Sequence, residues 1–133
     1  MNDRFKFRVW NKEQNRFHHS FSCDITASGT LVISQGIEGK KYIVDDDDYV
    51  VQQCTGLKDK NGKLIYEGDI VADVNTGCVA TIEYLPYTYS LMVHIRRMDD
   101  YITIEDICFT EAEGTPFEVI GNIYENPELL EVK

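Results

Sequence analysis

Three residues near the N-terminus have side chains that could bind a metal. His18, His19 and Cys23 supply the nitrogen and sulfur atoms that zinc prefers. Neighbouring histidines on an extended strand point to opposite faces, so the pair lacks the spacing of two ligands on one ion. His94 is alone among apolar residues, which favours a hydrogen-bonded interior residue. The sequence therefore predicts no metal site and no cofactor.

A run of four carboxylates, Asp45, Asp46, Asp47 and Asp48, is the second candidate. Clustered carboxylates attract hard divalent cations. Consecutive side chains of an extended segment alternate between faces, however, so these four converge poorly on one ion. We expect a solvated loop that is a candidate contact with another molecule.

The stretch KDKNGKLIYEGDIV, residues 58–71, has the most sharply specified turn chemistry in the chain. Read from Asp59 as a calcium loop, it lacks the glycine and the glutamate that such a loop needs at fixed positions. Asn61-Gly62 instead predicts a hairpin turn, because both residues tolerate positive φ. A second turn is predicted at Gly68-Asp69. These four residues are therefore predicted to be structural.

No nucleophile stands in a recognisable catalytic context. The sequence has no G-x-S-x-G and no Walker-type glycine loop. The cysteines are far apart and form no C-x-x-C pair: Cys23, Cys54, Cys78 and Cys108. The N-terminus has no apolar core of a signal peptide, so we expect reduced, mostly buried thiols in the bacterial cytoplasm. The sequence predicts a protein that is not an enzyme.

The elements that must position these residues are short strands. In RFKFRVW, residues 4–10, Phe5, Phe7 and Val9 alternate with basic side chains, which is typical of a half-buried strand. The basic face carries Arg4, Lys6 and Arg8. Basic residues interleaved with aromatics can bind single-stranded nucleic acid. Here the aromatic residues are assigned to the opposite, core-facing side.

Further strand patterns recur about every ten residues along the chain, eight to ten in all, which is typical of a sandwich or barrel. Near the C-terminus, Asn126, Pro127 and Glu128 are a helix start signal, so one or two helical turns are expected there. The predicted fold class is mainly β.

Three blocks of the sequence resemble the YopX family of phage and prophage proteins. They are KFRVW, TGLKDKNGKLIYEGDIV and FEVIGNIYENPELL, and they frame nearly the whole chain in the expected order. The resemblance implies a mainly β protein with an SH3-like barrel, encoded by temperate phages of low-GC Gram-positive bacteria. It implies no activity. Cys54 replaces a more frequent aromatic residue and Asn11 a frequent aspartate, without disturbing the fold assignment.

Two parts are therefore expected. An N-terminal β region is predicted over residues 1–54. An SH3-like barrel is predicted over residues 55–133, including the connecting hairpin and the C-terminal helical turn.

Charge indicates the kind of partner. Residues 1–41 hold seven basic and four acidic side chains, a net of +3, and residues 42–133 hold six and nineteen, a net of −13. An acidic body repels phosphate backbones and favours cationic partners. We expect a protein-interaction module that binds itself, or a host or phage protein with a basic patch, and not a membrane. The alternative is a nucleic-acid-associated accessory protein that uses the basic N-terminal strand.

Overall fold

The protein is mainly β, as the sequence predicts. The computed structural model describes residues 6–18, 23–35, 40–44, 48–86, 90–103 and 116–130. The strands in these ranges are β1 (Phe7–Asn11), β2 (Arg16–Phe17), β3 (Cys23–Ile25), β4 (Leu31–Gln35), β5 (Lys40–Val44), β6 (Tyr49–Lys58), β7 (Leu64–Tyr66), β8 (Asp69–Asp73), β9 (Val79–Leu85), β10 (Ser90–Ile95), β11 (Asp100–Thr103) and β12 (Phe117–Asn122). The helical turn expected near the C-terminus is the 3-10 turn η4 (Pro127–Leu130).

The chain divides into two compact units. One is Arg8–Gln52, and the other combines Met1–Phe7 with Gln53–Lys133. The boundary falls within β1 and β6, whereas the sequence predicts a division after residue 54. Each unit is described by itself.

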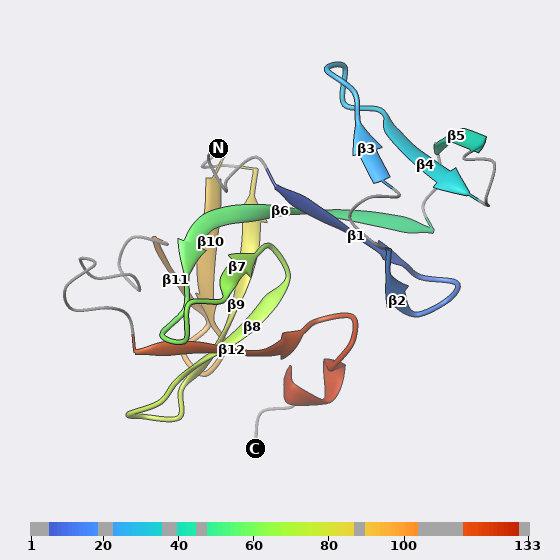
Figure 1. Ribbon diagram of the computed structural model, residues 1–133. Helices are drawn as coiled ribbons and strands as arrows, with labels where there is room; N and C mark the ends of the chain where they lie inside the picture. Colours follow the sequence, from blue (N-terminus) through green and yellow to red (C-terminus); the bar gives the residue numbers. More distant parts are fainter. Residues whose placement is uncertain are drawn as a thin grey trace. The chain divides into compact units, whose positions relative to one another are not determined.

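The larger unit contains a five-stranded antiparallel sheet of order β11-β10-β9-β8-β12. Its last strand in the sequence, β12, pairs with its first, β8. A register shift between Val119 and Gly121 bends β12. Figure 1 shows β12 running across the direction of β10, so the sheet curls on itself.

The concave face of this sheet carries the core. Its buried members are Ile65, Val71, Ala80, Ile82, Val93 and Phe117. Leu91, Ile95 and Ile102 pack against them. Because side chains alternate along a strand, the residues between them on β9, β10 and β11 face the other side. That other face holds the polar cluster described below.

The hairpin between β6 and β7 differs in detail from its prediction. Gly62 has φ 83°, whereas φ of Asn61 is not positive. The predicted two-residue turn needs positive φ at both residues, so the hairpin uses another turn. The Gly62 N–H instead donates to the Asp59 carbonyl, at 3.0 Å. The turn therefore spans Asp59–Gly62, with only its last residue in the left-handed region.

A buried carboxylate fixes this turn to β12. Asp59 is 6% exposed. Its Oδ1 accepts from the backbone N–H groups of Asn61 and Lys63, at 2.8 and 2.9 Å. Its Oδ2 accepts from the Val119 N–H of β12, at 3.0 Å. The Lys60 N–H also donates to the Phe117 carbonyl, so the turn satisfies two groups on the edge of β12.

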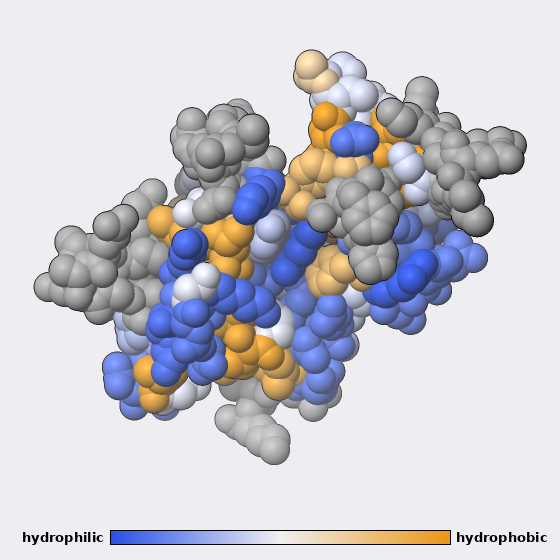
Figure 2. All heavy atoms as spheres, viewed as in Figure 1, coloured by the Kyte–Doolittle hydropathy of each residue, from blue (hydrophilic) through white to orange (hydrophobic). Residues whose placement is uncertain are grey.

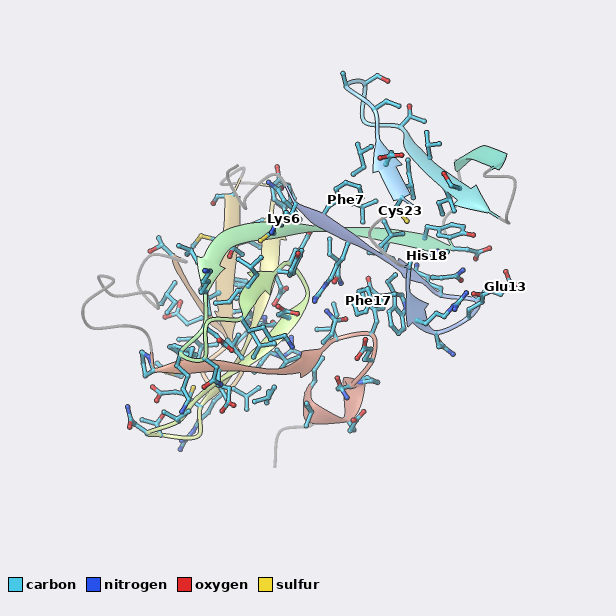
Figure 3. All side chains as sticks on the ribbon, viewed as in Figure 1. Lys6, Phe7, Glu13, Phe17, His18 and Cys23 are labelled. Atoms are coloured by element: carbon cyan, nitrogen blue, oxygen red, sulfur yellow. The ribbon has the colours of Figure 1, made fainter. Side chains whose placement is uncertain are left out.

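The smaller unit holds the β1–β2 hairpin and the β3-β4-β5 sheet. Trp10 is paired with Phe17 in register, and their rings meet edge to face at 4.9 Å. The Arg8 guanidinium lies 4.6 Å from the centre of the Phe17 ring. The predicted separation of aromatic and basic faces is therefore wrong for Arg8, because Phe17 of the neighbouring strand lies against its guanidinium. Figure 3 shows Phe17 and His18 beside β1 and β2.

Three of the cysteines lie in the described ranges, and none of these three forms a disulfide. Cys23 and Cys54 are buried and Cys78 is half-buried. Cys108 lies outside the described residues. No helix in the described ranges is long and apolar enough to cross a membrane.

Candidate functional site

A row of side chains crosses the outer face of the five-stranded sheet. Thr81 of β9 lies opposite His94 of β10, and His94 lies opposite Tyr101 of β11. Glu83 follows Thr81 on the same face of β9. The turn between β10 and β11 adds Asp99. Antiparallel pairing thus brings together polar groups that the sequence separates by many residues.

His94 is held between two carboxylates. Its Nδ1 lies 2.5 Å from Glu83 Oε2, and its Nε2 lies 2.7 Å from Asp99 Oδ1. An ionised carboxylate only accepts hydrogen bonds, so a ring that donates from both nitrogens satisfies both contacts. His94 is 8% exposed, and this pairing compensates its burial. The sequence-based interpretation of His94 as a hydrogen-bonded residue thus matches its surroundings.

The ring of Tyr101 covers His94. The two rings stack with centres 4.4 Å apart and planes 13° from parallel. Desolvation raises the pKa of the Tyr101 phenol, and the negative charges of Glu83 and Asp99 raise it further, while Arg96 lowers it. Tyr101 therefore remains a neutral phenol at physiological pH and can donate a hydrogen bond. It is not poised as a base.

The cluster contains a hydroxyl, two carboxylates and a histidine, which invites comparison with a catalytic relay. The Thr81 Oγ1–H donates to Glu83 Oε2, at 2.7 Å. Thr81 is only 1% exposed, however, so no substrate reaches its hydroxyl. Thr81 contacts the Glu83 carboxylate rather than the His94 ring, so the hydroxyl and the imidazole do not form a direct nucleophile–base pair. The arrangement connects β9, β10 and the following turn.

That turn is the exposed part of the site. Asp99 has φ 51°, one of the two positive values among the described non-glycine residues. Its contact with His94 holds this uncommon conformation in place. Met98 beside it is 70% exposed, and Tyr101 is 38% exposed. We call residues 97–101 the β10–β11 turn surface.

The other residues singled out in the sequence come from other segments of the chain. Asp48 is exposed, and its backbone carbonyl accepts from Lys12 N–H, while residues 45–47 lie outside the described ranges. Asn61 and Gly62 form the end of the Asp59 turn. Gly68 has φ 84°, and buried Asp69 accepts from the Tyr66 N–H at 2.7 Å. Within the larger unit, the structure does not bring Asn61, Gly62, Gly68 or Asp69 into the His94 cluster.

Two of the zinc candidates, His18 and Cys23, lie in the described part of the smaller unit. His18 Nε2 lies 3.3 Å from Asn11 Nδ2, and its ring lies against Tyr49. His19 lies outside the described residues. Within the described part of the chain, no group of three or more histidine, cysteine or carboxylate side chains could hold a metal ion.

Comparison with known proteins identifies the family. The family model described as YopX protein matches residues 6–131. The chain belongs to the YopX family. The crystal structure of protein EF1440 from Enterococcus faecalis is similar to it, with a TM-score of 0.61 and 28% identity over 95% of this chain and 97% of that one. No curated protein matches the chain.

A second solved structure supports the fold. The X-ray structure of protein yopX from Bacillus subtilis has a TM-score of 0.63 and 24% identity, covering 98% of this chain and all of that one (100%). Both likenesses extend along nearly the whole chain. The family resemblance seen in the three sequence blocks is therefore confirmed.

Sequence reasoning missed the partners of His94. Glu83 and Asp99 resemble other surface carboxylates, of which the chain has many. The available signal was the hairpin pattern: pairing TIEY with LMVH in register places Thr81 opposite His94, with Glu83 next along on the same face. Asp99 lies in a turn, where alternation gives no guidance.

Proposed function

We propose that this YopX-family protein is a non-enzymatic interaction module whose β10–β11 turn surface binds another protein. The observation that carries the proposal is Met98, 70% exposed at a turn that His94 fixes from beneath. Methionine and tyrosine are enriched at protein interfaces. A turn held in one conformation also loses little entropy on binding. Met98 and Tyr101 are the expected apolar anchors.

The charge of the molecule favours a partner with a basic patch. The net charge is −10, and Asp99 and Asp100 contribute two exposed carboxylates to the turn surface. Complementary charge accelerates encounter and selects among partners. The Asp45–Asp48 segment is proposed as a second acidic contact. A second copy of this chain is also a candidate partner.

We also propose that the five-stranded sheet is an SH3-like barrel and that the protein is of phage or prophage origin. Placing β12 beside β8, with β9, β10 and β11 following in sequence, supports a small five-stranded barrel of the SH3-like kind. Figure 2 shows polar surface broken by apolar groups on the face it draws. Phage or prophage origin and action in the host cytoplasm rest on the family resemblance, with relatives in Enterococcus and Bacillus as support.

The contacts of Arg8 weigh against the nucleic-acid alternative. Its Nε donates to the buried Gln52 side chain, at 2.8 Å, and its guanidinium lies over Phe17. A guanidinium that makes such internal contacts has fewer N–H donors left to bind a phosphate. Lys6 is exposed, and Arg4 lies outside the described residues.

The first experiment compares proteins captured from host extract by the wild type and by Met98→Ser. Val74→Ser is the matched control, because Val74 is 47% exposed in a different turn. A partner identified this way is then purified and titrated. We expect Met98→Ser to weaken its binding about tenfold or more, and Val74→Ser to leave it unchanged. Equal affinity for all three proteins would refute the proposed surface.

A second titration tests the alternative. Fluorescence anisotropy with single-stranded and duplex DNA at low salt should show no tight binding. Sub-micromolar affinity that disappears when Lys6 and Arg8 are neutralised would replace the proposed function by the nucleic-acid one.

A further inference from the structure

The β6–β7 turn contains a dipeptide that can modify itself. In Asn-Gly, the glycine backbone nitrogen can attack the asparagine side-chain carbonyl, because glycine has no side chain to obstruct the approach. A bond forms between Gly62 N and Asn61 Cγ, and the bond between Asn61 Cγ and Nδ2 breaks. The proton of the Gly62 N–H leaves together with the Asn61 amide nitrogen as ammonia. Water then opens the cyclic imide, which gives aspartate or isoaspartate. The reaction needs no reagent besides water.

The folded turn holds both reacting groups away from this reaction. The Gly62 N–H donates to the Asp59 carbonyl at 3.0 Å, so the attacking nitrogen retains its proton. Asn61 Nδ2 donates to Glu118 Oε1 at 3.1 Å, and Asn61 N–H donates to Asp59 Oδ1 at 2.8 Å. Side chain and backbone are thus tied to different partners. The reaction must wait until the turn opens.

The product would not fit the same contacts. Aspartate at position 61 replaces the Nδ2 donor by an oxygen that faces the Glu118 carboxylate, and like charges at that distance repel. Isoaspartate adds a methylene to the backbone between two groups that Asp59 binds. Either product weakens the attachment of the turn to β12, at the Lys60–Phe117 and Asp59–Val119 hydrogen bonds.

We propose that Asn61 is a self-modification site controlled by opening of the β6–β7 turn, and that its conversion irreversibly loosens this turn from β12. The inference is independent of the partner-binding role of the β10–β11 turn surface. It concerns a different hairpin. It follows from the dipeptide and from the three hydrogen bonds that restrain it.

The rate of conversion of Asn61 tests the first part of the proposal, that opening of the turn controls the reaction. Wild-type protein is kept at mildly alkaline pH, native or in denaturant, and peptide mass spectrometry separates asparagine, aspartate and isoaspartate at position 61. Native protein should react about tenfold or more slowly, since local opening limits it. Glu118→Ala should accelerate the native reaction, and Gly62→Ala should suppress the denatured one. Asn75, in an exposed turn before a threonine, is the internal control. Equal reaction rates in native and denatured protein would show that opening of the turn does not limit the reaction at Asn61.

Hydrogen exchange tests the second part of the proposal, that conversion of Asn61 loosens the turn from β12. In Asn61→Asp, the Lys60 and Val119 amides should exchange faster than in the wild type, and adding Glu118→Gln should restore part of their protection. Asn75→Asp is the matched control and should leave both amides unchanged. Unchanged exchange in Asn61→Asp would show that conversion does not loosen the turn.

Discussion

At the scale of single residues, Asp59 binds backbone amides from two different elements. Its carboxylate accepts from Asn61, Lys63 and Val119, with donor distances of 2.8–3.0 Å. Hydrogen bonds to a charged group are among the stronger ones, and buried donors without an acceptor are costly. One side chain thus fixes both the turn and its attachment to β12.

Replacing Asp59 by alanine should therefore be strongly destabilising. We expect a loss of about 3 kcal/mol in the free energy of unfolding, measured by urea denaturation, because buried N–H groups lose their acceptor. Asp73→Ala is the control. Its Oδ1 accepts from Asn75 N–H in an exposed turn, so water can replace it. Equal losses in the two variants would contradict the assigned role of Asp59.

Glu67 gives a prediction about pH. Burial raises the pKa of its carboxyl, while a hydrogen bond from the Gln53 backbone lowers it. The folded protein therefore holds this proton more tightly than the unfolded chain, and stability from this group falls as pH rises through the carboxyl range. Glu67→Gln should be more stable than the wild type at neutral pH, with a difference that disappears in acid. Thermal unfolding as a function of pH measures this, and exposed Glu125→Gln should show no such gain.

At the scale of elements, two glycines show different constraints. At Gly121 an added Cβ would lie 2.6 Å from Asn126 Oδ1 and 2.9 Å from Leu129 Cδ1. The close approach of β12 to the η4 turn therefore needs a residue without a side chain. At Gly62 an added Cβ meets nothing within 4 Å, but φ is +83°. Space is the constraint at Gly121, and backbone conformation is the constraint at Gly62.

We expect Gly121→Ala to lower the free energy of unfolding by about 1–3 kcal/mol, because η4 must shift. Asn126→Ala removes the nearest atoms, so the double variant should lose less than the two single losses added together. Gly62→Ala should cost about 1 kcal/mol through φ alone, and Asn126→Ala should not change that cost. Chemical denaturation of the five variants gives all these values. Additive losses at 121 and 126 would contradict the steric explanation.

The sequence predicts short strands well and their partners poorly. Alternation over residues 4–10 predicts a strand, and the structure has one at Phe7–Asn11. The Asn-Gly signal predicts a turn at residues 61–62, and the structure has a turn over Asp59–Gly62. The role of Asp59 was not predicted, because its Val119 partner is 60 positions away. The same reason applies to the Glu83–His94 contact, since a local pattern does not define which strands become neighbours.

At the scale of the whole molecule, acidic side chains far outnumber basic ones. The chain has 23 acidic and 13 basic side chains. Such an excess keeps a protein soluble but opposes compaction through self-repulsion. Ion pairs between neighbouring side chains act locally and in the opposite direction. The long-range repulsion should outweigh the effect of exposed pairs, because those contribute little.

The unfolding temperature should therefore rise as salt screens the excess charge. We expect an increase between about 10 mM and about 150 mM sodium chloride, and little further change once the screening length falls below the spacing of surface charges. Differential scanning calorimetry near neutral pH measures this. Sucrose at matched osmolality is the control for general solute effects. Near the isoelectric point of about 4.6 the same salt step should have almost no effect, since no net charge remains to be screened. An unfolding temperature that falls with salt at neutral pH would mean that local ion pairs dominate, with the His94 cluster as the first place to look for them.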